Sequence, residues 1–545
     1  MTLILLEYLI AFSIIFLISI YFRKYLQKFI ADHHNFLLLL AVFFLSRIIV
    51  SSAFPIFNDE AIYIQYAQGI NANFSQYKFI SINNIYGDWK PPLQYWWGSI
   101  FINLFYDPVF SARFASILFS LFGFVGIYFL VLYLYGRREA LWASAIFIIC
   151  PPILMYNTQF VAETYVFSAA TIFYLFSLLA MRAPKINYWF LGLAILSGAA
   201  LLLFKQSGAL YLYLGLLLSF IPTGGLGTGV NPLLKKLLLM TLIAIASFLI
   251  YKLIIPFDLA LGANWFTARW TFSFWEIGQL PTNAWFSNLS SVFDFYLYYY
   301  TLAAIFIIFG FIFYVFSRRD VRDLVICFMF LVSSLSVIIG LKSFNEYIYN
   351  TAAIIFLVII LARLAAILSE HAPRGHLSRP VLVTNLVLGL FYAIMIGIWL
   401  YQVGLMKISP IKYIERSSPW MRGNYLTGWS GGFGIGQVID LLKRQEGPAL
   451  AIVDPQWGNP GTALQVYQNY YPQVLTIPLS QDFLDPARRR ELHLEEFKNR
   501  FVIFSKRDIV TRDDAWRQNV LDNFCLKREE FKEYEKQTPI VVCEF

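Results

Sequence analysis

The sequence predicts a polytopic α-helical membrane protein that carries a globular α/β domain at its C-terminal end. Its 545 residues are 59% hydrophobic and only 14% charged, and their mean hydropathy is +0.61, which lies outside the range of ordinary soluble domains. A helix needs roughly 20 apolar residues to cross a bilayer. Such segments recur up to about residue 404, and beyond it short strand and helix patterns alternate.

The apolar segments give twelve expected transmembrane helices, within a range of about 11 to 13. They cover residues 3–22, 36–52, 110–134, 139–155, 164–181, 188–204, 206–222, 237–256, 292–316, 324–341, 347–366 and 381–402. The first segment is kept as a span because Glu7 and the lack of a basic start or a small-residue cleavage site argue against a removed signal peptide.

Basic residues fall on every second loop between these spans, and such loops are cytoplasmic by the positive-inside rule. The remaining loops, chiefly 57–106 and 257–291, are then external, as is everything after about residue 404. We therefore expect a membrane domain over 1–404 and an external α/β domain over 405–545, in a multi-pass protein of the cell (plasma or inner) membrane whose site faces the external, periplasmic side. The net charge of +9 is spread over loops and tail instead of forming one face, so no nucleic-acid partner is expected.

The C-terminal region reads as alternating strands and helices. Strands are expected at 450–454, 474–478, 501–505 and 540–543. Helices are expected at 461–470 and 513–524, and a further one is opened by the glycine-rich stretch 428–436 and runs to Lys443. The glycine-rich stretch 428–436 favours a tight turn over a phosphate-binding loop, since no strand precedes it. Cys525 and Cys543 both lie in this exported region, where a bridge between them or two free thiols are both open. Cys150 and Cys327 are expected to fill the core within spans.

Charged and aromatic residues gather at the outer ends of the spans and on the outer loops. The acidic ones are Asp59, Glu60, Asp88 and Glu163, the cationic ones are Lys90, Arg113, Lys205, Arg269 and Lys342, and aromatic residues such as Tyr63 and Trp89 accompany them. Lys205 lies between two apolar runs with no acidic residue near it in sequence, so a lipid phosphate is its expected partner, and snorkelling is the alternative. Asp59 and Glu60 alone could simply interact with a helix dipole.

Several of these motifs, in this order, resemble one known family. They are Asp59-Glu-Ala-Ile-Tyr63, Lys90-Pro-Pro-Leu93, Arg113, Phe204-Lys-Gln-Ser-Gly208, and the stretch from Tyr425 to Gly434 followed by a strand, Asp454 and Gly458. The chain resembles the GT-C superfamily of membrane glycosyltransferases. More narrowly it is similar to the protein O-mannosyltransferase-like and aminoarabinose-transferase-like branch, which is glycosyltransferase family 39-like.

The resemblance implies transfer of a hexosyl or pentosyl sugar from a polyprenyl-phosphate donor to a protein, lipid or envelope-glycan acceptor at the membrane surface. Asp59 corresponds to the catalytic base, which fits the need of a sugar hydroxyl for a general base. The expected donor-phosphate residues are Lys90, Arg113, Lys205, Arg269 and Lys342. Glu60, Asp88 and Glu163 are expected to act as further acidic site residues, and Tyr63 and Trp89 to contact the substrate.

A direct inverting displacement is expected because one base and a phosphate leaving group suffice, although two carboxylates could support retention. Asp59, Glu60, Asp88 and Glu163 have the oxygen ligands that a divalent cation uses. Phosphate binding by lysines makes such an ion unnecessary, so no obligate metal or other cofactor is expected. The competing functions are a polyprenyl-lipid or polysaccharide transporter or flippase, and a non-catalytic assembly protein whose external domain binds envelope polymer.

Overall fold

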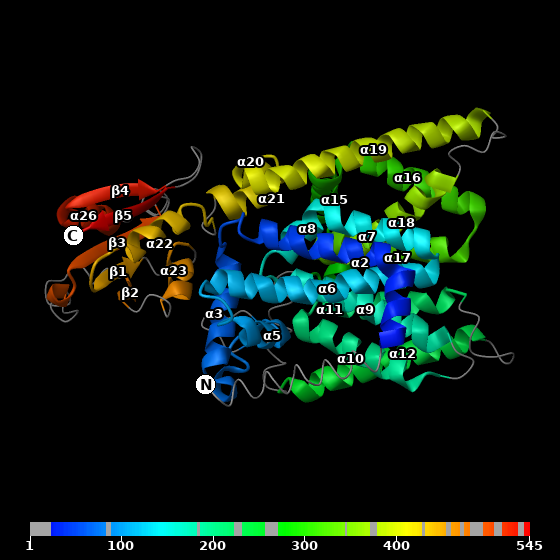
Figure 1. Cartoon of the computed structure of the whole chain (residues 1–545), viewed down its shortest axis with the longest axis horizontal. Helices are drawn as coiled ribbons and strands as arrows, with labels where there is room; N and C mark the ends of the chain where they lie inside the picture. Colours follow the sequence, from blue (N-terminus) through cyan, green and yellow to red (C-terminus); the bar gives the residue numbers. More distant parts are fainter. Residues whose placement is uncertain are drawn as a thin grey trace.

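The structure is a computed structural model of the whole chain (Figure 1). It describes residues 23–82, 89–182, 186–222, 232–256, 271–343, 346–370, 379–427, 431–453, 459–468, 473–479, 494–505, 515–531 and 539–545. The first expected span, residues 3–22, lies outside the described residues. So do Asp88, Arg269 and Asp454.

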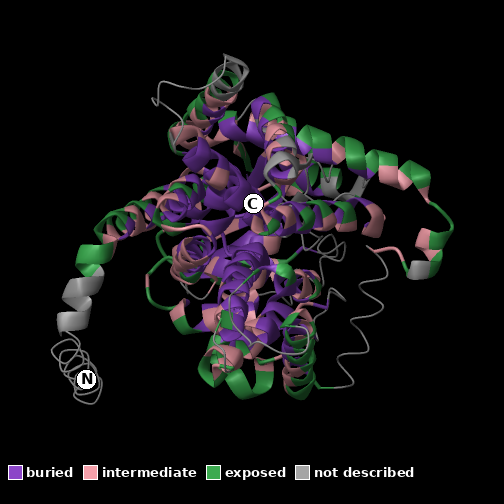
Figure 2. Ribbon diagram, turned by 90° about the vertical axis from the view of Figure 1, so that its right-hand side faces the viewer, coloured by how far each residue is buried: buried purple, intermediate pink, exposed green. Residues whose placement is uncertain are grey.

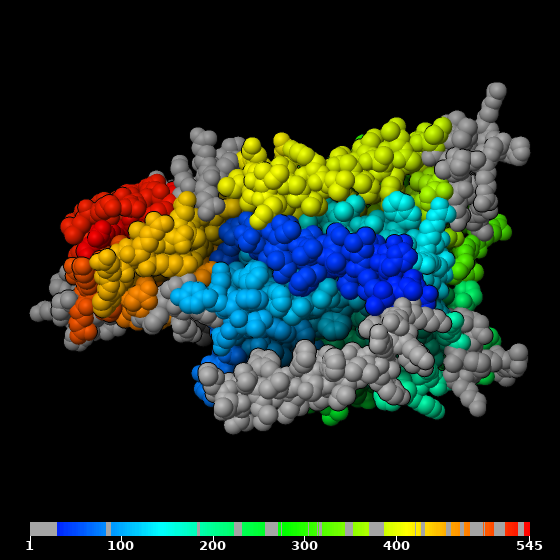
Figure 3. Space-filling model, viewed as in Figure 1, coloured from blue at the N-terminus to red at the C-terminus, as the bar shows by residue number. Residues whose placement is uncertain are grey.

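A bundle of apolar helices forms the larger part of the molecule, and the sheet domain lies at one end of it (Figures 1 and 3). The bundle helices are α2 (Arg23–Ser51), α6 (Pro108–Leu134), α7 (Arg137–Ile149), α8 (Pro151–Asn157), α9 (Ala162–Arg182), α10 (Tyr188–Phe204), α11 (Gly208–Gly215), η1 (Leu216–Phe220), α12 (Pro232–Ile254), α15 (Thr282–Phe295), η2 (Tyr296–Tyr300), α16 (Thr301–Arg318), α17 (Val321–Gly340), α18 (Glu346–Glu370) and α19 (Arg379–Ile408).

Six helices within the described residues are long and apolar enough to cross a membrane, and two bent helix pairs raise that number to eight. Three shorter apolar helices, Tyr188–Phe204, Gly208–Phe220 and Ala353–Ser369, coincide with further expected spans. Buried residues gather inside the bundle and exposed ones on its outer faces (Figure 2). On α12 the exposed face is apolar, with Leu238, Leu242, Ile245 and Leu249 at helical spacing, as expected for a surface in contact with lipid. The predicted fold class is confirmed.

A break between α7 and α8 shows how the sequence bends a span. Pro151 and Pro152 lack N–H groups, so the carbonyls of Phe147 and Ile148 lose their i+4 donors. Fully buried Arg47 on α2 donates instead to the Phe147 carbonyl at 2.9 Å and the Ile148 carbonyl at 2.8 Å. The two helices meet at 66°. The bend therefore follows from a proline pair whose freed carbonyls are bound by one arginine.

Three short helices cover the end of the bundle beside the sheet domain (Figure 1). They are α3 (Asn58–Ala72), α4 (Phe74–Tyr77) and α5 (Leu93–Phe101). Asn71 on α3 donates to the Ser99 carbonyl on α5 at 2.8 Å, and Trp97 on α5 donates to the Ala115 carbonyl on α6 at 2.8 Å. These bonds attach the polar, aromatic loop after α2 firmly to the bundle.

The C-terminal domain is built on one mixed sheet with strand order β2-β1-β3-β5-β4. Its strands are β1 (Ala449–Val453), β2 (Val474–Pro478), β3 (Asn499–Ser505), β4 (Lys527–Phe531) and β5 (Ile540–Glu544), and its helices include α22 (Ile435–Lys443), α23 (Gly461–Tyr467) and α26 (Ala515–Phe524). β1 is parallel to β2 and β3, and β5 is antiparallel to β3 and β4. Short helices α20 (Pro410–Glu415), α21 (Pro419–Arg422) and η3 (Gly423–Thr427) connect the domain to α19.

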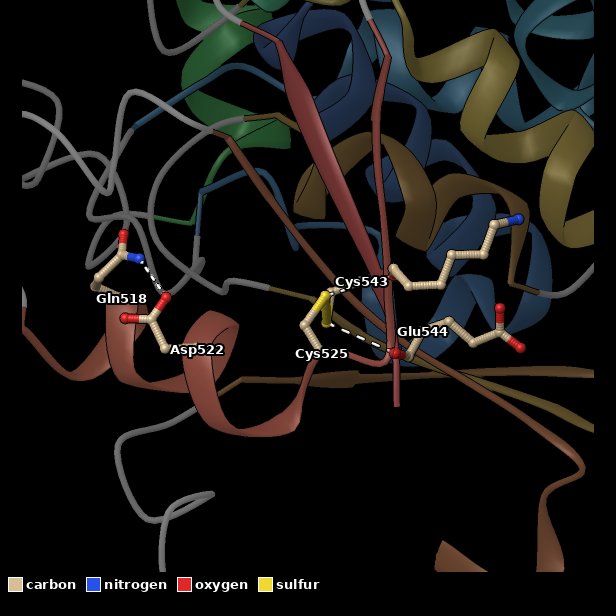
Figure 4. The surroundings of a disulfide bond; sticks show 6 residues. Gln518, Asp522, Cys525, Cys543 and Glu544 are labelled. Atoms are coloured by element: carbon tan, nitrogen blue, oxygen red, sulfur yellow. Dashed lines mark hydrogen bonds between the residues drawn. A yellow bond between two sulfur atoms is a disulfide. The ribbon is translucent and has the colours of Figure 1, made fainter.

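The sequence predicted each of these strands except β4. Its residues, Lys-Arg-Glu-Glu-Phe, are mostly charged because β4 is the edge strand and pairs only with β5, and edge strands commonly carry charge. Cys525 and Cys543 form a disulfide that joins the residue after α26 to β5 (Figure 4). Of the two alternatives left open by the sequence, the structure contains the bridge.

Candidate active site

Asp59 and Glu60 occupy the first turn of α3, where two carboxylates interact favourably with the helix N-terminus. Successive helical residues point about 100° apart, so these neighbours face different surroundings. Glu60 is fully buried, whereas Asp59 is only partly buried. The two carboxylates therefore have different chemical roles available to them.

Glu60 forms a two-pronged ion pair with Arg113 of α6. Arg113 Nε donates to Glu60 Oε1 at 2.8 Å, and Nη2 donates to Oε2 at 2.6 Å. The remaining Arg113 hydrogens go to the carbonyls of Ser51, Phe54 and Pro55. All five N–H donors of the guanidinium thus bind protein oxygens.

The Phe160 backbone N–H also donates to Glu60 Oε1, at 2.9 Å. Glu60 consequently ties together α3, α6 and the segment that precedes α9. Arg113 holds the loop between α2 and α3 through its three carbonyl bonds. This buried cluster fixes the start of α3, and with it the backbone that carries Asp59.

The Asp59 carboxylate, in contrast, has no hydrogen-bond donor or ion-pair partner among the described residues. Along α3 it shares a face with Tyr63 and Tyr66, at i+4 and i+7. Burial raises the pKa of the neighbouring Tyr95 well above its usual range, and Tyr63, Lys90, Tyr66 and Asp59 all act on it electrostatically. Asp59 and Lys90 thus lie around the same tyrosine.

Lys90 is positioned by its backbone and by an aromatic ring. Its N–H donates to the Ser81 carbonyl at 3.1 Å, and Ser81 Oγ donates to the Lys90 carbonyl at 2.8 Å. The ammonium lies 4.6 Å from the centre of the Tyr63 ring, within the range of a cation–π contact. Trp89, which is expected to contact substrate, is 5% exposed and packs in the core.

Lys205 forms an ion pair with Glu163, which corrects the expectation that it has no acidic neighbour. The two residues are 42 positions apart, and the antiparallel hairpin of α9 and α10 brings the start of one helix beside the end of the other. The side chain of Lys205 is 27% exposed and that of Glu163 only 6%. Two ammonium hydrogens of Lys205 stay available, since the pair uses one of three.

A row of aromatic rings connects this ion pair to the surroundings of Asp59. Ring centres are 6.5 Å apart for Tyr95 and Phe160, 6.1 Å for Phe160 and Tyr165, and 5.2 Å for Tyr165 and Phe204. Phe204 directly precedes Lys205. A continuous row of packed rings therefore leads from Tyr95, which Asp59 and Lys90 both act on, to Phe204 beside Lys205.

Lys342 belongs to a second outer region. It binds Glu276 of α14 (Phe274–Gly278) with an Nζ to Oε1 distance of 2.7 Å. Glu276 also completes a capping box with Ser273. The Lys342 hydrogen bond and the Ser273 bonds lower the pKa of Glu276 to about 2. No described contact joins this pair to Asp59.

The C-terminal domain packs against α3 through contacts that the sequence did not predict. Gln65 Nε2 donates to the Thr462 carbonyl at 2.7 Å, and Gln68 Nε2 donates to the Val466 carbonyl at 2.8 Å, both on α23. Gln68 lies about half a turn around α3 from Asp59, and Gln65 lies about a third of a turn from it. These two contacts to α23 are therefore made from the side of α3 away from Asp59.

The glycine-rich stretch takes part in the same contact. Gly432 packs against the Ile56 carbonyl so closely that an added Cβ would overlap with that oxygen, and Asn459 Nδ2 donates to the Ile56 carbonyl at 3.2 Å. Ile56 lies three residues before Asp59. The only local signal in the sequence for these contacts is the pair Gln65 and Gln68, which lie three positions apart on the partly buried helix α3.

No group of three His, Cys, Asp or Glu side chains in the described parts of the chain could hold a metal ion. A divalent cation shared by Asp59, Glu60 and Glu163 does not fit the geometry, because Glu60 and Glu163 are already paired with Arg113 and Lys205. Asp88, the fourth candidate ligand, lies outside the described residues.

Comparison with known proteins identifies the architecture. Residues 89–251 match the family profile of dolichyl-phosphate-mannose-protein mannosyltransferase. The crystal structure of ArnT from Cupriavidus metallidurans bound to undecaprenyl phosphate superimposes with a TM-score of 0.51 at 12% identity, over 93% of this chain and 97% of that chain. The chain has the GT-C fold. The resemblance expected from its motifs is confirmed.

Two further solved structures share the GT-C architecture. ArnT from Cupriavidus metallidurans in the apo state has a TM-score of 0.50 at 14% identity, covering 94% of this chain and 98% of that one. The apo Archaeoglobus fulgidus oligosaccharyltransferase has a TM-score of 0.50 at 12% identity, covering 88% and 70%. No curated protein matches the chain. The likeness establishes the GT-C fold.

Proposed function

We propose that this GT-C protein is a glycosyltransferase that moves a sugar from a polyprenyl-phosphate donor to a hydroxyl acceptor at the membrane surface beside α3. The observation that carries the proposal is the contrast between two adjacent carboxylates. Glu60 is saturated by Arg113 and the Phe160 N–H, whereas Asp59 is partly exposed and unpaired among the described residues. A general base must be able to reach the acceptor hydroxyl with a carboxylate oxygen that is not already bound, and Asp59 meets this requirement.

In the proposed reaction Asp59 accepts the proton of the acceptor hydroxyl. The acceptor oxygen then forms a bond to the anomeric carbon, while the bond from that carbon to the phosphate oxygen breaks. The electron pair leaves with the polyprenyl phosphate, whose added negative charge needs cationic stabilisation. Attack from the side opposite the leaving group inverts the anomeric centre.

Lys90 and Lys205 are the proposed phosphate-binding residues. Lys90 belongs to the Asp59 cluster and Lys205 retains two ammonium hydrogens beside Glu163. Arg113 is left out of this role because all its donors are bound within the protein, and we assign it to holding the loop before Asp59. Tyr63, on the Asp59 face of α3 and under the Lys90 ammonium, is the proposed aromatic contact for the sugar.

The lipid part of the donor is proposed from the GT-C neighbour and from the apolar surface. The matched ArnT crystal structure contains undecaprenyl phosphate, and the outer faces of the bundle here expose apolar side chains. A long isoprenoid could lie along such a surface with its phosphate at the lysines. The C-terminal domain, fixed to α3 through Gln65 and Gln68, would leave the Asp59 carboxylate open to the acceptor.

The test is release of polyprenyl phosphate by the purified protein from a panel of labelled polyprenyl-phosphate sugars with native membrane extract as acceptor source. Turnover of one donor by the wild type, lost in Asp59→Asn and retained in Asp440→Asn, supports the proposal. Asp440 is a 60% exposed carboxylate on α22 and serves as the matched control. Equal turnover by wild type and Asp59→Asn would contradict the proposed base, and lipid movement across vesicles without sugar transfer would favour a flippase.

A further inference from the structure

A cavity of about 500 Å³ opens at the end of the bundle opposite Asp59. It lies between the last turns of α6 and α9, the end of η1 and the start of α17, and Phe129, Leu179, Arg182, Ile221 and Arg322 contribute to its walls. Along α6 the cavity is about 27 Å from Arg113, at 1.5 Å per residue. It is therefore separate from the proposed catalytic cluster.

The walls combine apolar and aromatic side chains with two guanidinium groups. Its volume is within the range of small-molecule sites, which are mostly apolar with a few placed polar groups. Both arginines sit at helix ends, Arg182 in the last turn of α9 and Arg322 in the first turn of α17. A ligand with an apolar part and an anionic part would match these walls.

The positive charges around the cavity exceed the negative ones in the described residues. Arg322 is neutralised by Asp320, with an Nη2 to Oδ2 distance of 2.7 Å. Arg182 is exposed and lies over the Tyr133 ring at 5.4 Å, and no described carboxylate pairs with it. A third cation, buried Lys236, donates to the carbonyl of the wall residue Ile221 at 2.8 Å.

The helix dipole of α9 favours a cation at Arg182, but it does not account for an open apolar cavity beside that cation. An arginine at the boundary of an apolar region typically pairs with an anion or marks a functional site. Arginine binds phosphate oxygens through its planar fork of donors. The missing anion is most simply supplied by the membrane itself.

We propose that this cavity binds the phosphate of an anionic phospholipid from the leaflet opposite the Asp59 site, with Arg182 as the principal contact. The headgroup phosphate would lie between Arg182 and Arg322, and an acyl chain would follow Phe129 and Leu179. The bound lipid would hold α6, α9 and α17 together at this end. This site is independent of sugar transfer and does not depend on the proposed function.

The test is native mass spectrometry of the full-length protein with phosphatidylglycerol or phosphatidylcholine added at matched concentrations. The wild type should retain phosphatidylglycerol preferentially. Arg182→Gln should weaken that retention about tenfold or more, as expected from loss of a charge-assisted hydrogen bond. Lys235→Gln, which removes an exposed charge on α12 at the same end of the bundle without lining the cavity, should retain the preference.

A second variant separates cavity binding from surface charge. Leu179→Trp keeps both arginines but fills the cavity, so it should also lose phosphatidylglycerol. Unchanged retention in Arg182→Gln or in Leu179→Trp would overturn the proposal. So would complete competition by millimolar inorganic phosphate, which would indicate a free-anion site, or selective retention of polyprenyl phosphate over phosphatidylglycerol.

Discussion

At the scale of single residues, the functional contrast lies between Asp59 and Glu60. They are adjacent and chemically alike, yet Glu60 is buried against Arg113 while Asp59 faces Tyr63, Lys90 and Tyr95. The sequence predicts an acidic pair at a helix start. It could not predict which of the two carboxylates is paired within the protein, because the partners of Glu60 are distant in sequence. Arg113 is 53 positions away and the Phe160 N–H is 100 positions away.

The Glu60–Arg113 pair gives a stability prediction. Arg113→Gln leaves a buried carboxylate without its partner, so we expect a loss of about 3–5 kcal/mol in the free energy of unfolding. Thermal unfolding of the detergent-purified protein measures it. If Arg113→Gln leaves the unfolding midpoint unchanged and weakens donor binding, the structural role of Arg113 is contradicted and a role in binding the donor phosphate is supported.

The ion pair of Glu276 and Lys342 gives a pH prediction. The pKa of Glu276 is lowered to about 2 from its ordinary value of 4.5, so the pair stabilises the fold above the ordinary value and loses this contribution as the pH falls toward 2. The stability difference between wild type and Lys342→Gln should therefore be small and constant near neutral pH and should shrink below about pH 4.5. Unfolding midpoints across that range measure it, and a difference that grows on acidification would contradict it.

At the scale of elements, local pattern predicted most helices and strands but not their partners. Apolar runs located the helices, and β-branched runs located β1, β3 and β5. The charged edge strand β4 lacked such a run. The partner of Lys205 was also missed, because Glu163 reaches it only through the α9–α10 hairpin.

The contact between Gly432 of the C-terminal domain and the loop before α3 leads us to predict that a larger residue at position 432 will reduce sugar transfer. A methyl group at Gly432 would overlap with the Ile56 carbonyl, so Gly432→Ala should displace the start of α3 and reduce sugar transfer by about tenfold or more, since small misplacements of catalytic groups are costly. The control is Gly436→Ala, where an added methyl meets nothing within 4 Å and alanine favours the helix. Transfer rates per folded protein measure the effect, and equal rates in the two variants would contradict it.

At the scale of the whole molecule, the GT-C bundle and the C-terminal sheet domain meet at α3. Gln65, Gln68 and Asn459 make that contact through backbone carbonyls, which leave little trace in a sequence pattern. Composition predicted the membrane bundle, and alternating strand and helix patterns predicted the α/β tail. The placement of the tail against α3 required the structure.

The most direct measurement is the turnover number for sugar transfer by Asp59→Asn at saturating donor, with the unfolding midpoint of the same preparation. We predict a fall of about 10²- to 10⁴-fold, the usual contribution of a general base. The midpoint should stay close to that of the wild type, because Asp59 has no hydrogen-bond or ion-pair partner among the described residues and the substitution removes only its weak interaction with the N-terminus of α3. Wild-type turnover in a folded Asp59→Asn variant would contradict the assignment of Asp59 as the base.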